Sequence, residues 1–134
     1  MNVANRHFIG LVLLIAVLAA AAAVGQDQAA KQRELIAVLQ SNAASAEKAI
    51  TCKQLAIYGT EEAVPSLMPL LADKELASWA RIALEVIPGP AADEALREAM
   101  GTLQGRLLVG AINSIGVRRD AMAVDGLVQK LGDN

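Results

Sequence analysis

The sequence has a single cysteine, Cys52, a single histidine, His7, and only one residue each of Trp, Tyr and Phe. One cysteine cannot form a disulfide within the chain, and we expect Cys52 to be buried, the alternatives being a free thiol or a disulfide with another chain. Because His7 lies near the N-terminus, the chain after residue 25 has no histidine. No residue cluster amounts to a catalytic or metal site, and we expect no cofactor.

Signals for β-strands are also missing. Val, Ile and Thr do not alternate with polar residues anywhere, whereas Ala and Leu dominate, and this composition predicts an all-helical fold. About a hundred residues can form only a modest single core, but a stack of helix pairs needs none, because each pair buries its apolar face on its neighbours.

Basic residues show no excess, since 12 Lys and Arg stand against 14 Asp and Glu. A mildly acidic surface of mixed sign argues against nucleic-acid binding, which requires a basic patch that displaces counterions.

Residues 1–25 have the three parts of an export signal: a polar start, an apolar run at residues 8–18 and a tail of small residues. We predict a signal peptide cleaved before Gln26 and a periplasmic or secreted protein. The alternative is an uncleaved anchor, because the apolar stretch at residues 8–24 is near the lower length limit for spanning a bilayer. The protein would then meet the membrane only through that stretch.

The rest of the chain, residues 26–134, repeats two patterns with a period of about 30 residues, which is typical of a helical solenoid. The first pattern is an apolar pair four residues apart, found at Leu35/Leu39, Leu67/Leu71, Leu96/Met100 and Leu127/Leu131. The second is an apolar trio on one helix face, found at Ile50/Leu55/Tyr58, Trp79/Leu84/Ile87 and Leu107/Ile112/Ile115.

These patterns predict two alternating kinds of helix. Paired-leucine helices are expected near residues 30–40, 62–72, 91–102 and 120–131, and glycine-ended helices near residues 45–58, 75–87 and 105–115. We expect Gly59, Gly89 and Gly116 to end the second kind, because glycine readily takes the positive φ that a helix end often needs. Pro69 should bend the second paired-leucine helix.

Two stretches, CKQLAIYGTEEAVPSLMPLLAD and GAINSIGVRRDAMAVDGLVQKLGD, resemble HEAT repeats of the short variety named for phycobilisome lyases. The match lies in the apolar helix face, the glycine that ends it, the charged loop, the Ala-Val-Pro helix start and the closing Asp. It extends from about Lys31 to Asp133, and the middle unit departs most, with Pro-Gly-Pro at residues 88–90. The resemblance implies a right-handed α-α superhelix of about three helix pairs plus an N-terminal helix.

The end of the sequence adds an expectation about packing. Leu127, Val128 and Leu131 give the last helix an apolar edge, whereas terminal repeats ordinarily have a polar outer face. We expect this edge to pack on further repeats or on another subunit, which makes the repeat domain incomplete at its C-terminus.

Several charged or aromatic residues invite a functional interpretation. The acidic residues Glu61, Glu62, Asp93, Glu94 and Glu98 are expected to form a solvated surface. Trp79 belongs to an apolar trio, which predicts a place in the core. Arg81, Arg97 and Arg106 are predicted either to form a cationic patch that grips a partner's carboxylate or to cover the interface between helices with their aliphatic stems.

The HEAT resemblance implies that the paired-leucine helices line the concave, partner-binding side. The exposed positions there are expected to be Ser66, Asp93, Arg97, Asp125 and Gln129.

Three functions remain open. The first is a non-catalytic scaffold that binds a protein partner outside the cytoplasm. The second is a spacer or cap attached to a catalytic or electron-transfer domain, an arrangement that the resemblance to exported repeat proteins implies. The third is a bilin-lyase-like accessory factor, which the absence of histidine after residue 25 disfavours.

Overall fold

The computed structural model describes residues 25–132. Residues 1–24, which contain the predicted export signal and its alternative membrane anchor, lie outside the described residues. Within residues 25–132, no helix is long and apolar enough to cross a membrane. The chain divides into two units, residues 1–31 and residues 32–134. The described part of the first unit is helical, and the remaining description concerns the second.

Helices and short 3-10 turns make up all the regular structure of residues 25–132, which confirms the all-α class. A first helix ends at residue 40. The elements after it are α2 (Ser45–Tyr58), η1 (Glu61–Ala63), α3 (Val64–Leu67), η2 (Met68–Ala72), α4 (Ala77–Val86), α5 (Pro90–Thr102), α6 (Gly105–Arg118), η3 (Ala121–Ala123) and α7 (Val124–Gly132). Each predicted helix is present, with bounds within a few residues of those expected.

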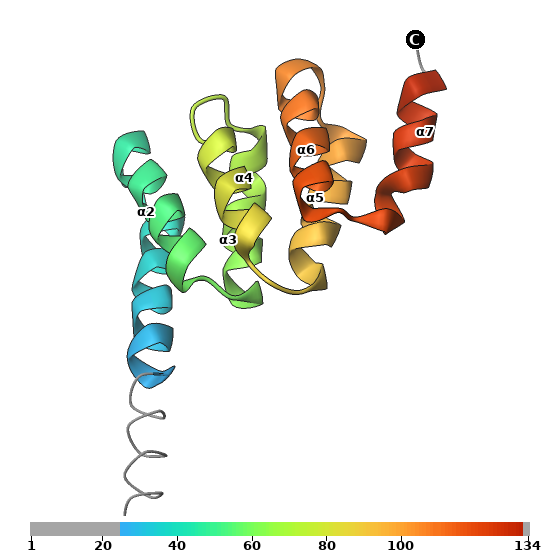
Figure 1. Cartoon of the computed structure of the whole chain (residues 1–134). Helices are drawn as coiled ribbons and strands as arrows, with labels where there is room; N and C mark the ends of the chain where they lie inside the picture. The colour runs from blue at the N-terminus through green and yellow to red at the C-terminus, as the bar shows by residue number, and fades with distance from the viewer. Residues whose placement is uncertain (1–24, 133–134) are drawn as a thin grey trace, which may run out of the picture. The chain divides into compact units, whose positions relative to one another are not determined.

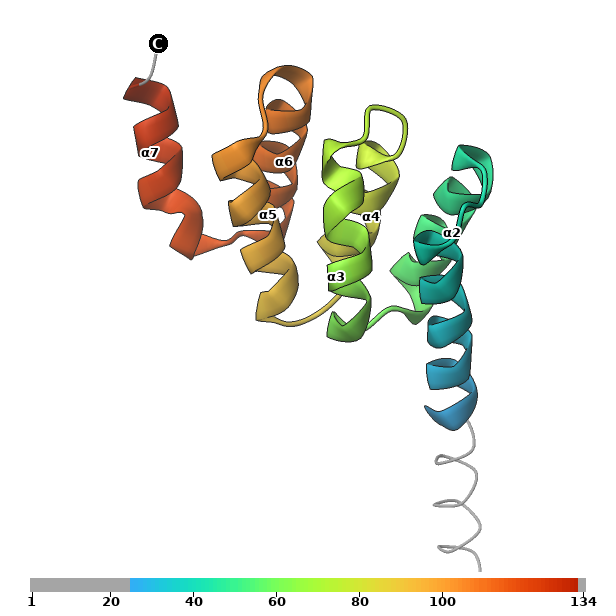
Figure 2. The same ribbon diagram turned by 180° about the vertical axis from the view of Figure 1, so that it is seen from behind.

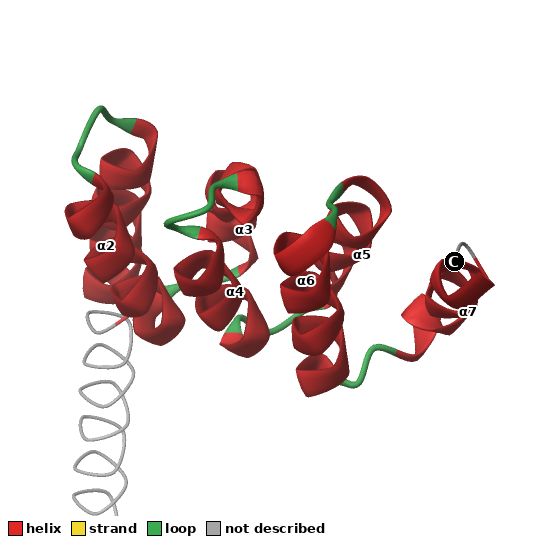
Figure 3. Cartoon of the chain, turned by 90° about the horizontal axis from the view of Figure 1, so that it is seen from above, coloured by secondary structure: helices red, strands yellow, loops and turns green. Residues whose placement is uncertain are grey.

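Within the second unit the two kinds of helix form two adjacent rows (Figures 1 and 2). The glycine-ended helices make one row, in which α4 contacts α2 on one side and α6 on the other. In the other row α5 contacts α3 and η2. The rows are joined where α5 packs on α6 and η2 packs on α4, and Figure 3 shows these neighbours end-on.

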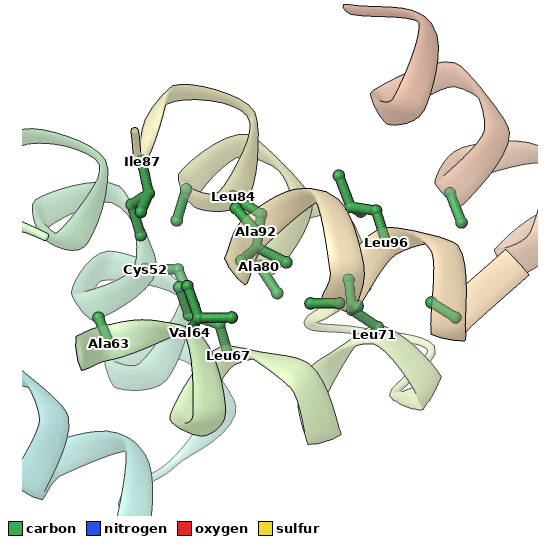
Figure 4. Close-up of a cluster of buried hydrophobic side chains, with 14 of the residues drawn as sticks. Cys52, Ala63, Val64, Leu67, Leu71, Ala80, Leu84, Ile87, Ala92 and Leu96 are labelled. Atoms are coloured by element: carbon green, nitrogen blue, oxygen red, sulfur yellow. The ribbon is translucent and has the colours of Figure 1, made fainter. Parts of the chain in front are cut away.

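The core between the rows is built from leucine and alanine (Figure 4). Leu67 and Leu96 of the apolar pairs are fully buried, and Leu84 of the middle trio is 0% exposed. Ala80 and Ala83 of α4 are also fully buried, because small side chains let neighbouring helices approach closely. Most of the apolar positions predicted from the repeat lie in or against one continuous cluster, to which Ile50, Tyr58, Leu107 and Leu131 do not belong.

The first trio departs from the prediction. Ile50 is 59% exposed and Tyr58 is 37% exposed, whereas Thr51 and Cys52 are buried beside Leu55. The reason is that α4 packs between two glycine-ended helices, but α2 packs against only one, α4. The face of α2 that corresponds to the second contact remains in solvent.

The glycines at the helix ends act differently from one another. Gly89 has the expected positive φ of 95°, but Gly59 is extended, with φ −76°. Glycine is needed at Gly59 for space, because a Cβ there would lie 2.4 Å from the carbonyl oxygen of Leu55. Gly116 lies inside α6, and the left-handed conformation is adopted three residues later by Arg119, with φ 56°.

Pro69 was expected to bend its helix, and the structure shows that the α-helix is interrupted there. The α-helical turn α3 ends at Leu67, and the chain continues as the 3-10 segment η2, which contains Pro69. Proline lacks the N–H that an α-helix would use at this position.

Cys52 is predicted to be unreactive while the protein is folded. Its side chain is 0% exposed, and burial raises the pKa of the thiol from 9.0 to about 11. Because the reactive species is the thiolate, alkylation by iodoacetamide at pH 8 should proceed only after denaturation. Rapid modification of the native protein would contradict this burial.

The raised pKa of Cys52 also predicts a pH dependence of stability. Below the unfolded-state pKa of about 9 the thiol is protonated in both states, and its full contribution to stability is present. That contribution is lost as the pH rises toward the folded-state pKa of about 11. In urea titrations between pH 9 and 11, the wild type should lose more stability than Cys52→Ala, in which this titration is absent.

Candidate functional site

Polar side chains tie together the connecting loops that follow the glycine-ended helices, which we define as residues 59–60, 87–89 and 119–120. At the first loop, Gln32 accepts a hydrogen bond from the backbone N–H of Thr60 and donates one to Glu62 at 3.0 Å. Glu61 in turn accepts from the N–H of Ala91, at 3.1 Å, beyond the second loop. These partners lie 28 to 30 residues apart, so the hydrogen bonds follow the period of the sequence.

Arg118 is the most extensively bonded residue of these ties. Its Nη1 donates to the carbonyl oxygens of Leu84 and Ile87, at 2.7 Å each, and its Nη2 donates to that of Gly89 at 2.9 Å. Its Nε forms an ion pair with Asp93. One guanidinium therefore satisfies the carbonyl groups at the end of α4 and links them to the start of α5.

The five residues of the predicted binding face differ in their availability. Asp93 is paired with Arg118, and Arg97 is paired with Asp120. Ser66 is half-buried and accepts a hydrogen bond from Gln40 at 3.1 Å. Only two members of the face are exposed with no hydrogen bond or ion pair among residues 25–132, and these are Asp125 and Gln129.

The acidic residues have structural partners rather than a common centre. Glu61, Glu62 and Asp93 each accept a hydrogen bond from a neighbouring element, while Glu94 and Glu98 are exposed on α5. Across the described part of the chain, no three His, Cys, Asp or Glu side chains are placed to hold a metal ion.

The most distinctive surface feature lies between the first turns of α4 and α6. Two neighbouring cavities open to solvent, one of about 400 Å³ and a shallower one of about 600 Å³, share the side chains of Arg81 and Arg106. We call them together the α4–α6 groove. Its lining residues are Lys74, Ala77, Ser78, Arg81, Gln104, Gly105, Arg106, Leu107, Val109, Gly110 and Asn113.

Arg81 is held in the groove by the neighbouring helix. Its Nη1 donates to the carbonyl oxygen of Gly110 at 2.9 Å and to Oγ of Ser114 at 3.2 Å. The guanidinium also packs on Gly110, because a Cβ added at that residue would lie 2.8 Å from both Cζ and Nε of Arg81 and would force this side chain to move. Ser114 is itself oriented by a hydrogen bond to Glu85 at 2.6 Å. The position of the guanidinium is therefore fixed before any ligand arrives.

The groove carries positive charge from three side chains and negative charge from none. Lys74 and Arg106 are exposed and have no hydrogen-bond or ion-pair partner among the described residues. At the start of α6 the Gln104 side chain makes no capping hydrogen bond, so the first N–H groups of this helix add partial positive charge beside Arg106. Nearby Asp73 accepts from the backbone N–H groups of Glu75 and Leu76 and does not line the groove.

The sequence identified part of this groove. Arg81 and Arg106 belong to the set for which either a cationic patch or a cover over the helix interface was expected, but Arg97, of the same set, pairs with Asp120 in the other row of helices and lines neither cavity. Lys74 was not predicted, and it lies in the turn before α4, whereas Arg106 lies in the first turn of α6. The sequence also offered Gly110 as an indication of the groove, because a glycine in the interior of a helical pattern often marks a place where another group approaches the helix backbone closely.

Comparison with protein-family models, curated proteins and solved structures finds no match to the chain.

Proposed function

We propose that the chain is a non-catalytic scaffold that binds a protein partner and that its helix pairs form a HEAT-like right-handed α-α superhelix, exported from the cytoplasm. The observation that carries this proposal is the preformed α4–α6 groove. It presents a fixed guanidinium, two exposed cations and a helix start on the surface of neighbouring helix pairs. Such an arrangement suits recognition of another molecule by charge and shape.

The contacts between helices support a repeat architecture. Along the row of glycine-ended helices, α2 contacts α4 and α4 contacts α6. The polar ties likewise join residues about one period apart, since the Gln32 side chain, on the first helix, accepts from Thr60, and that of Arg118, at the end of α6, donates to Ile87. In repeat proteins each unit packs mainly on its neighbours, and the resulting extended surface serves for binding.

The other two functions that the sequence left open, a spacer or cap and a bilin-lyase-like accessory factor, remain alternative proposals. The apolar edge that the sequence places on α7 is exposed in the structure, with Val128 at 62% and Leu131 at 78%. Its packing against further repeats or another subunit stays a prediction. We found no observation that favours a bilin-handling role over a scaffold.

The proposal is tested by affinity capture with the purified chain after residue 25. The immobilised protein is exposed to an extract of the exported fraction from its source cells. Retained proteins are identified by mass spectrometry, and the complex is rebuilt from purified components. A stoichiometric complex that survives gel filtration is expected. If no protein forms such a complex, or if the chain chemically alters what it binds, the scaffold proposal is wrong.

A further inference from the structure

We propose that the α4–α6 groove binds an extended, acidic segment of the partner protein, with a carboxylate of that segment on Arg81. This inference rests on the proposed scaffold function and adds the chemistry of the partner. It is carried by the hydrogen-bonding capacity left on Arg81, by the two cations beside it and by the length of the groove.

Arg81 has unused donors on a guanidinium that is already positioned. Only its Nη1 is occupied, by Gly110 and Ser114. Nε and Nη2 have no acceptor among the described residues. No side-chain nitrogen or oxygen of the described residues is both fully buried and unpaired, so these two donors keep some exposure to solvent, although both lie close to Gly110 of α6. A guanidinium with two free N–H groups binds a carboxylate more specifically than an ammonium does.

The charges around Arg81 favour an anion over a neutral ligand. Lys74 and Arg106 line the same cavity as Arg81, and no carboxylate lines either cavity. The acidic group in this hydrogen-bond network is Glu85, which accepts from the Ser114 hydroxyl to which Arg81 donates, but it forms no ion pair with Arg81 among the described residues and lines neither cavity. The protein as a whole has a net charge of −2, so this local excess of positive charge is not a general property of its surface.

The shape of the groove favours a peptide over a small anion. The lining runs along α6 from Gln104 to Asn113. At the helical rise this is about 13 Å, the length of roughly four extended residues. The lining also includes Val109, which is 67% exposed, and Asn113, which lies on the same part of α6 as Gly110, to which Arg81 donates. The amide of Asn113 can pair with a peptide backbone, whereas a phosphate ion would contact only part of this lining.

The test uses the folded chain after residue 25 and a fluorescent peptide with several glutamates separated by alanine and glycine. Its counterpart has glutamine at the same positions. Anisotropy titrations should show binding of the glutamate peptide and at least about tenfold weaker binding of the glutamine peptide. The affinity should fall as the salt concentration rises. Equal binding of the two peptides would overturn the proposal.

Variants of the chain test whether the peptide binds in the groove. The double change Lys74→Glu and Arg106→Glu should weaken binding at least about tenfold, whereas Lys130→Glu on α7 makes a charge reversal outside the groove and should change it less than about twofold. Gly110→Ala should weaken binding by about three- to tenfold because the added methyl displaces the Arg81 guanidinium. Gly116→Ala is its control on the same helix, with nothing within 4 Å of the added Cβ.

Two further outcomes separate this inference from the scaffold function. Inorganic phosphate that competes as tightly as the peptide would identify a small-anion site and would overturn the peptide proposal. If the partner found by affinity capture binds the Lys74→Glu, Arg106→Glu variant as well as the wild type, the scaffold stands and the groove inference is wrong. Circular dichroism of every variant establishes that the fold is retained.

Discussion

Replacing Arg118 with alanine should lower the free energy of unfolding by about 3 to 5 kcal/mol. The side chain is 9% exposed and forms an ion pair with Asp93, which is 25% exposed. It also donates to three backbone carbonyl groups between Leu84 and Gly89. Alanine leaves that carboxylate and those carbonyls without their partner, and such loss costs more than the interaction itself contributes. Urea denaturation followed by circular dichroism measures the change.

Two further variants serve as controls for Arg118→Ala. Arg106→Ala removes an arginine from the same helix that is exposed and has no hydrogen-bond partner in the described residues, and it should change stability by less than about 0.5 kcal/mol. Arg118→Lys keeps the charge but loses the planar fork, so an intermediate loss is expected. If Arg118→Ala unfolds like Arg106→Ala, the ties between the connecting loops do not contribute to stability as we propose.

Replacing Leu84 with alanine should cost about 2 to 5 kcal/mol. Leu84 is 0% exposed and lies on α4, the helix that contacts both α2 and α6. The loss combines the transfer of the removed carbons with the cavity that remains, and packed helices close such a cavity only in part. The same urea titration reports it.

The control for Leu84 lies two residues along the same helix. Val86 is 57% exposed, so Val86→Ala should stay within about 0.5 kcal/mol of the wild type. Comparable losses in the two variants would mean that the buried face of α4 has been assigned incorrectly.

Most of the fold could be predicted from the repeat period of the sequence. Leucine pairs such as Leu67 and Leu71 are buried where predicted, because a solenoid-like pattern places the same face inward in every unit. The pattern failed for Ile50, which is exposed, because periodicity identifies equivalent positions but not whether a neighbour covers them. It also placed the end of α6 too early, because Arg119 adopts the left-handed conformation that glycine was expected to supply.

The candidate site was less predictable, for a physical reason. Exposure and pairing of charged residues depend on the packing of neighbouring repeats, which composition does not reveal. Asp93 and Arg97 were expected on an open binding face, yet each forms an ion pair. Trp79 was expected in the core, and it packs only partly against it, with Lys53 Nζ 5.4 Å from the ring centroid.

The central claim is that a partner's acidic segment lies in the α4–α6 groove. The most direct test is to map the changes in backbone amide chemical shifts by NMR. In a titration of isotopically labelled protein with the glutamate peptide, we predict the largest changes at residues 74–81 and 104–113. The connecting loops and α7 should change little. If the largest changes instead surround Asp125 and Gln129 on α7, the binding face is the one formed by the paired-leucine helices, and the groove assignment is wrong.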